Sequence, residues 1–99
     1  MKPEVRVISY VRGTTEDERR GLLGFLRVAY GELILDSVVL RRTSEGRYAL
    51  AFPSRDDRAG RRHAIVRPAH DDARREIERQ VLADLANRSD FSGSEEGGR

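Results

Sequence analysis

The segment that most constrains the fold is residues 47–55, in which an alternating apolar stretch ends at a proline and leads into arginines. Tyr48, Leu50 and Phe52 recur at every second position, which is the period of a pleated strand with one buried face. The small alanines between them indicate that the second face is also covered, or nearly so. The proline that follows has no N–H to donate to a sheet ladder, so regular pairing should end there. We therefore expect a central core strand that opens, over residues 54–62, into a short, mobile and basic loop.

The chain is short and contains no cysteine, and these two facts exclude several classes of protein. Its 99 residues suit one small domain with a modest core and no deep cleft between lobes. Without cysteine there are no disulfides or thiolate metal sites, and two histidines are too few for a histidine-based zinc site without carboxylates. No signal segment is visible, and no apolar run approaches the roughly 20 residues of a membrane span. We expect a soluble cytoplasmic protein without metal, cofactor or membrane contact.

Positive charge is concentrated in the middle of the chain. Eight arginines lie between residues 41 and 67 against three carboxylates, which gives that part a net charge of +5. The whole chain carries +2, so the remainder carries −3. The planar guanidinium of arginine binds phosphate through two parallel hydrogen bonds, which indicates a phosphate-bearing partner. The alternative is a solvated loop that is neutralised by its own acids, Asp56 and Asp57.

Alternating apolar residues predict three strands ahead of the central one. These strands cover residues 5–11, 22–30 and 32–42. Val5, Val7 and Val11 fall at odd-numbered positions, so we expect them to share one face of the first strand. The polar segment after it is expected to be an exposed loop with at most one helical turn. Gly31 lies between the next two strands and predicts a tight hairpin connection, because glycine adopts positive φ freely.

Two positions predict irregular backbone within or between strands. Asp36 lies inside the third strand, where aspartate is disfavoured, so we expect it at a bulge, on an exposed face or against an arginine. Gly46 is the position in the next turn that most needs a positive φ.

The carboxy-terminal part predicts one further short strand and one helix. The strand covers residues 62–68 and is closed by a proline. Asp71 and Asp72 suit the amino terminus of a helix, where free N–H groups carry partial positive charge. An apolar stripe with a spacing of four follows and is formed by Ile77, Val81 and Leu85. Asn87 is expected to end the helix.

Together these elements predict one domain over residues 1–88 and a disordered polar tail over residues 89–99. The fold class is α+β, with an antiparallel meander of about five strands and the carboxy-terminal helix packed on or beside it. A sheet that is covered by a single helix leaves strand edges open, and open edges pair with another copy. We therefore expect a two-fold homodimer.

Three segments match the motifs of a known family. Residues 31–39 contain an aliphatic-x-Asp motif, residues 46–55 begin with glycine and end in AFPSR, and Gly60-x-Arg62 follows. In these motifs, and over roughly residues 4–86, the chain resembles the septation regulator family known as stage V sporulation protein G. The resemblance implies a small dimeric bacterial protein that binds DNA and RNA and regulates gene expression and septation. The chain departs from the family pattern Arg-Asp-Ile-x-His-Pro, in place of which it has RHAIVRP.

We predict that arginines on and around the basic loop bind nucleic-acid phosphates. The predicted site comprises Arg55, Arg58, Arg61, Arg62, Arg41, Arg42, Arg67 and Ser54. No catalytic residue or small-molecule substrate is expected, since no nucleophile–base pair, phosphate loop or metal cluster is recognisable. The alternative function is a protein-interaction or scaffold module of the division machinery, in which the charges only maintain solubility.

Four other residues have two interpretations each. His63 either contacts a base or phosphate or is a strand histidine that faces solvent. Tyr30 and Tyr48 either stack on bases, as sheet aromatics do in single-strand binders, or pack in the core. Asp36 is either a general base or a structural aspartate, and the lack of a second catalytic group favours the structural role.

Overall fold

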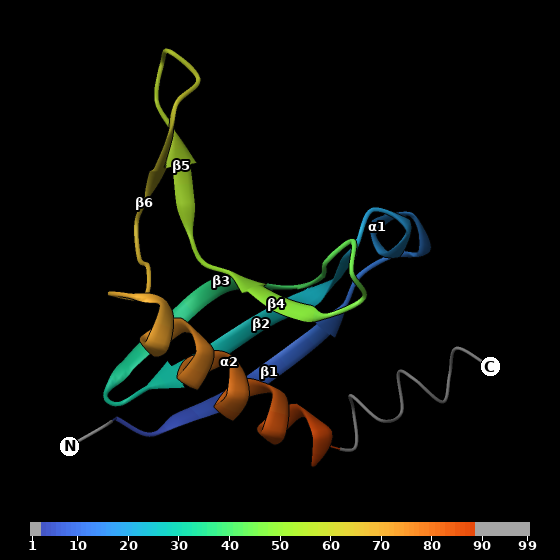
Figure 1. Cartoon of the computed structure of the whole chain (residues 1–99), viewed down its shortest axis with the longest axis vertical. Coiled ribbons are helices and arrows are strands. Elements are labelled where there is room, and N and C mark those ends of the chain that lie inside the picture. Colours follow the sequence, from blue (N-terminus) through green and yellow to red (C-terminus); the bar gives the residue numbers. More distant parts are fainter. Residues whose placement is uncertain (1–2, 89–99) are drawn as a thin grey trace.

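The protein folds as an antiparallel four-stranded meander with one long helix on one face and a separate two-stranded hairpin (Figure 1). The computed structural model describes residues 3–88. In chain order the elements are β1 (Val5–Arg12), α1 (Thr15–Arg19), β2 (Leu22–Tyr30), β3 (Leu33–Arg42), β4 (Tyr48–Ala51), β5 (Ser54–Asp56), β6 (Arg62–Ala64) and α2 (Asp71–Ala86). The predicted α+β class, with its antiparallel sheet and carboxy-terminal helix, is confirmed. The predicted tail, residues 89–99, lies outside the described residues.

Two expectations about strand order were wrong. The meander runs β1-β2-β3-β4, so β4 is an edge strand and not a central one. The fifth predicted strand, β6, pairs with β5 in the small second sheet and does not extend the meander. Both errors have the same cause, because strand neighbours are set by pairing across the fold and local periodicity does not report them.

The core lies between the meander and α2. Val38 and Leu40 of β3 and Val81 and Leu85 of α2 are all fully buried, with 0% of their surface exposed. The apolar stripe with a spacing of four therefore faces the sheet, as the sequence predicts. His70 caps the amino terminus of α2 by accepting from the Ala73 N–H, and Asn87 is the C-cap residue, as predicted.

A β-bulge in β1 changes which side chains face the core. Val5 and Val7 are buried, but Val11 is 62% exposed. The β1–β2 register shifts between Val7 and Ser9, and this shift moves every later residue of β1 to the opposite face. Tyr10 packs against the core instead. The expectation that Val11 shares the buried face was wrong because alternation does not reveal a one-residue insertion.

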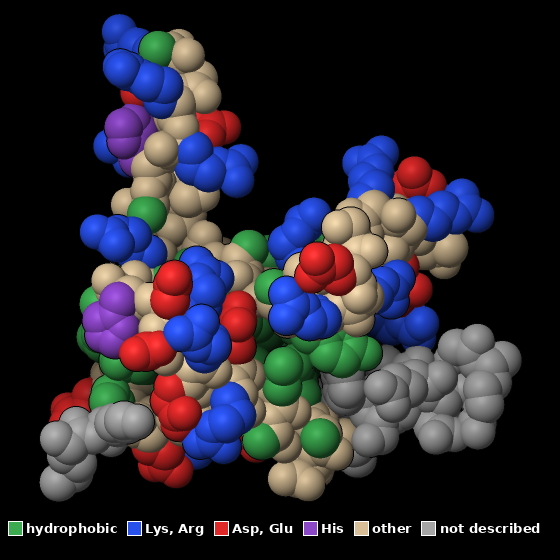
Figure 2. Space-filling model, in the orientation of Figure 1, with side chains coloured by type: hydrophobic (Ala, Val, Ile, Leu, Met, Phe, Trp, Pro, Cys, Tyr) green, Lys and Arg blue, Asp and Glu red, His purple; other side chains and the backbone are tan. Residues whose placement is uncertain are grey.

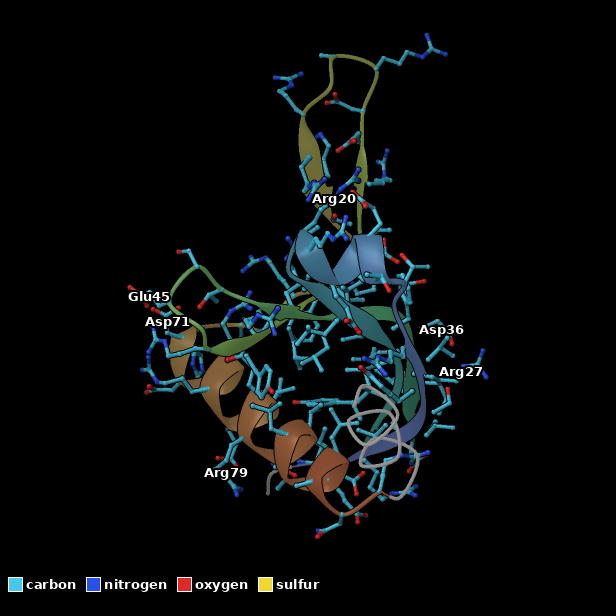
Figure 3. All side chains as sticks on the ribbon, turned by 90° about the vertical axis from the view of Figure 1, so that its right-hand side faces the viewer. Arg20, Arg27, Asp36, Glu45, Asp71 and Arg79 are labelled. Atoms are coloured by element: carbon cyan, nitrogen blue, oxygen red, sulfur yellow. The ribbon has the colours of Figure 1, made fainter. Side chains whose placement is uncertain are left out.

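Asp36 lies at a bulge, is exposed and contacts an arginine, so all three predicted settings hold together. The β2–β3 register shifts between Leu26 and Val28, opposite Asp36 and Ser37. The Arg27 Nε atom donates to Asp36 Oδ1 over 2.6 Å, and Figure 3 shows both side chains on the side of the sheet away from α2. Ser37 has a φ of 65°. The ion pair between Asp36 and Arg27 spans the irregular part of the β2–β3 pairing, so Asp36 is a structural aspartate.

Side chains of α2, and that of Arg88 just after it, form hydrogen bonds with the outer edge of β1. The Val7 N–H donates to Asp84 Oδ2 over 2.6 Å, and Arg88 Nη1 donates to the Val7 carbonyl over 2.8 Å. One turn earlier in the helix, Gln80 Oε1 accepts from the Val5 N–H at 3.3 Å. At Val5 and Val7 these contacts occupy backbone groups that an edge strand otherwise presents to another strand.

The same helix also covers the opposite edge of the meander, at β4. The Leu50 N–H donates to Glu78 Oε2 over 3.0 Å, and Arg74 Nη1 donates to the Leu50 carbonyl over 3.0 Å. Arg74 also lies over the ring of Phe52, 5.5 Å from its centroid. The sheet thus curves around α2, and the helix binds both of its edges. The argument for a homodimer from open edges fails at these positions.

Candidate nucleic-acid interface

The basic segment after β4 forms a projecting β-hairpin, which we call the arm and define as residues 53–65 (Figure 1). Pairing within the main sheet stops before Pro53, as predicted. It resumes at once between β5 and β6, with Arg55 opposite His63. The Pro53 carbonyl accepts from the Ile65 N–H at 3.0 Å and closes the base of the arm. The expectation of an irregular loop was therefore wrong, because the basic residues lie on a paired hairpin.

Asp57 organises the turn at the tip of the arm. Its carboxylate accepts from the N–H groups of Ala59 and Arg61, both at 2.9 Å, and contacts His63 Nε2 at 2.8 Å. Gly60 supplies the positive φ of 82° that the turn needs. Sequence reasoning treated Asp57 only as a neutralising charge. The Asp-x-x-Gly spacing of residues 57–60 is the local signal that identifies its role.

The hydrogen bond from His63 and those from the backbone N–H groups of Arg61 and Ala59 lower the pKa of Asp57. A lowered pKa in the folded state means that the ionised carboxylate stabilises the turn, and that this effect is present above the ordinary pKa of 3.8. It is lost as the pH falls through the lowered value. We therefore expect the amide NMR shifts of Ala59 and Arg61 to move on acidification with a midpoint below pH 3.8.

The control for this titration is Asp57→Asn, which keeps one carbonyl acceptor but cannot titrate. In this variant the two amide shifts should not respond to acid in the same range. An identical response in Asp57→Asn would show that another group governs the turn.

The four arginines of the arm differ in how well they are neutralised. Arg61 Nε lies 3.3 Å from Asp57, and Arg62 Nε lies 3.6 Å from the other aspartate of the arm. Arg55 and Arg58 are exposed and form no ion pair with any residue between 3 and 88. With four arginines against two aspartates, the arm carries +2. The two arginines without partners give the arm a local positive field that its own acids do not cancel.

A second basic group lies at the end of β3, next to α1. Arg41 and Arg42 line a shallow cavity of about 440 Å³ together with Glu18, Arg19 and Arg20 of the α1 region. Glu16 lies 3.6 Å from Arg19 and 3.7 Å from Arg20, so it partly neutralises both. The Arg42 N–H donates to the Gly21 carbonyl over 2.7 Å and fixes the two segments to each other. Figure 2 shows basic side chains on both projections of the molecule, the arm and the α1 region. Sequence reasoning missed Arg19 and Arg20, because only the β2–β3 pairing brings them next to β3.

The remaining predicted residues lie on two sides of the base of the arm. Ser54 is exposed and lines a cavity of about 380 Å³ that also includes Arg41 and Arg62. Arg67 is exposed but lines a different, mostly apolar cavity with Leu33 and other side chains. The structure therefore places six of the eight predicted residues on the arm and at its base. Arg42 meets this group only through Arg41, and Arg67 lies in a separate cavity.

The two tyrosines and the histidine that could contact bases lie in three different settings. Tyr30 packs against the core, in line with the packing interpretation. Tyr48 is 44% exposed and lies at the start of edge strand β4. His63 is held by Asp57, so its ring supports the turn of the arm.

Within residues 3–88, no group of three His, Asp or Glu side chains is placed to hold a metal ion. Neither described helix is long and apolar enough to cross a membrane. Comparison of the chain with protein-family models, with curated proteins and with solved structures finds no match.

Proposed function

We propose that this protein binds nucleic acid, DNA or RNA, through phosphate contacts made by the arm and by the arginines at its base. The observation that carries the proposal is the projecting hairpin whose Arg55 and Arg58 have no ion-pair partner among the described residues. Because the arm projects from the domain, its arginines can contact the backbone of a long nucleic acid without a concave groove that fits it. Phosphate contacts of this kind are largely blind to sequence and weaken steeply with salt.

The basic group at α1 extends the proposed surface. Arg41 lines both the cavity at the base of the arm and the cavity shared with α1. It therefore connects the two groups of arginines along one side of the molecule. A backbone that follows this path meets positive charge over a longer distance than the arm alone provides.

The biological role that we propose is regulation of gene expression and septation, and it rests on the family resemblance alone. The homodimer also stays a prediction of that resemblance, since side chains of α2 already bind the edge backbone at Val7 and Leu50, which weakens the argument from open edges. If the chain does not bind nucleic acid, the scaffold module of the division machinery becomes the better interpretation.

The test is the double variant Arg55→Ala/Arg58→Ala, measured on duplex DNA across a salt series. Each lost phosphate contact lowers the slope of log affinity against log salt by about 0.9, so we expect a slope smaller by roughly 1.8. Affinity for unrelated sequences should fall in similar proportion, because phosphate contacts do not read bases. The melting temperature should change little, since both side chains are exposed.

The matched control is Arg75→Ala/Arg79→Ala, which removes the same charge from α2. Arg75 is ion-paired with Asp72 at 2.6 Å, and Arg79 with Glu76 at 2.6 Å. This variant should bind like the original chain. If both double variants behave alike, or the arm variant keeps the original affinity and slope, the arm is a bystander.

A further inference from the structure

The face of the meander opposite α2 carries an apolar row that crosses all four strands. The pairing register places Val11 opposite Phe25, Phe25 opposite Val39, and Val39 opposite Ala51. The chain neighbours of these residues pack in the core against α2, and they are Tyr10, Leu26, Val38, Leu40 and Leu50. Successive residues of a strand point to opposite faces, so the row lies on the face away from the helix. Phe25 keeps 42% of its surface exposed there.

This row continues into the cavity at the base of the arm. Val39 and Ala51 form part of its lining, and Ile65, which is 61% exposed, adds a further apolar side chain. Arg41 and Arg62 line the same cavity of about 380 Å³. Arg41 follows Val39 by two positions on β3 and so lies on the same face of the sheet. The cavity therefore combines an apolar surface with two guanidinium groups.

We propose that this face binds a single nucleic-acid strand, with one unpaired base stacked on Phe25 and a neighbouring base in the cavity at the base of the arm. Arg41 and Arg62 then contact the phosphates beside that base. The inference rests on the proposed function and adds to it that the preferred ligand is single-stranded. Bases within a duplex are stacked on each other and present only their edges. An aromatic ring on an open sheet face can therefore stack only on an unpaired base.

The charges on this face favour a polyanion over a second copy of the chain. Arg41 has no ion-pair partner in the described part of the chain. The Arg62 Nε atom lies 3.6 Å from Asp56 Oδ1, and the Arg62 side chain is still 76% exposed. Asp36 lies on the same face but is already bound to Arg27. Two copies that met around a two-fold axis at this cavity would bring arginine against arginine, which opposes association at that position. A strand of phosphates meets the same arginines with opposite charge.

The experiment compares three ligands of equal length: oligo(dT) of 20 nucleotides, an abasic strand of 20 nucleotides, and a 20-base-pair duplex. Phe25→Leu keeps an apolar side chain but removes the ring. Loss of one stacked base is expected to weaken oligo(dT) binding by roughly 5-fold to 100-fold. Binding of the abasic strand and of the duplex should not change. The separate variant Phe25→Tyr keeps an aromatic ring and should bind oligo(dT) like the original chain. Ile65→Ala provides a second, exposed variant with the same expected pattern, should Phe25→Leu fail to fold.

Several outcomes overturn this inference. One is that Phe25→Leu binds oligo(dT) with the same affinity as the original chain. Another is that Phe25→Leu loses the same factor in affinity for oligo(dT) and for the abasic strand. A third is a dimer that Phe25→Leu converts to a monomer in sedimentation, which would make this face an interface between copies. The arm variant Arg55→Ala/Arg58→Ala distinguishes failure of the stacking inference from failure of the proposed phosphate binding. If it weakens all three ligands while Phe25→Leu changes none, phosphate binding stands and the stacking platform fails.

Discussion

Replacing Leu40 with alanine is expected to lower the free energy of unfolding by about 2–5 kcal/mol. Leu40 is fully buried, and it belongs to the same cluster as Val81 and Leu85 of α2. Truncation removes apolar contact and leaves a cavity that helix and sheet cannot close, because α2 is tied to both edges of the meander. A domain of this size has only about 5–15 kcal/mol of stability in total, so the loss is a large fraction.

Urea denaturation followed by circular dichroism measures this loss. The control is Leu33→Ala, since Leu33 is 64% exposed and should change stability by no more than about 0.5 kcal/mol. Equal effects of the two substitutions would show that the layer between β3 and α2 is not the core.

Replacing Asp84 with alanine is expected to cost about 1–3 kcal/mol of stability, because the Val7 N–H at the edge of β1 loses its acceptor. The same substitution exposes an unpaired strand edge, so we also expect self-association that increases with concentration. Thermal unfolding and light scattering measure the two effects.

Asp84→Asn keeps an acceptor oxygen and should lose less stability than Asp84→Ala. Asp72→Ala removes an exposed carboxylate from the same helix and should cost less than about 1 kcal/mol. If Asp84→Ala is no worse than Asp72→Ala and stays monodisperse, water replaces the lost carboxylate and α2 is not needed to cover the edge.

Hydrogen bonds from α2 and from Arg88 to both edges of the meander also bear on where the proposed binding surface lies. Gln80, Asp84 and Arg88 bind β1, while Arg74 and Glu78 bind β4. One face of the meander packs against α2, and the two edges are hydrogen-bonded at Val5, Val7 and Leu50. The surfaces that remain are the helix-free face and the arm, and these are the two that carry the exposed ring of Phe25 and the unpaired Arg55 and Arg58.

Local chemistry in the sequence determined the types of the meander strands and of the long helix and several of their limits, but not the pairing of the arm. The strand predicted for residues 22–30 has those same bounds in the structure, because its apolar residues and flanking glycines are all local signals. The helix after His70, with its stripe of Val81 and Leu85 and its end at Asn87, was likewise readable from spacing and capping residues. The clustering of arginines was also a property of the sequence.

Only the tertiary structure decided which partner each strand has, and with it the shape of the site. The bond between Val7 and Asp84 joins residues that are 77 positions apart, and no periodicity reports such a pair. The bulge that turns Val11 outward depends on pairing with β2, so alternation within β1 could not reveal it. In the same way, Arg41 meets Arg19 and Arg20 only because β2 pairs with β3. Secondary structure follows from contacts between near neighbours, whereas edges, faces and binding surfaces follow from hydrogen bonds between distant ones.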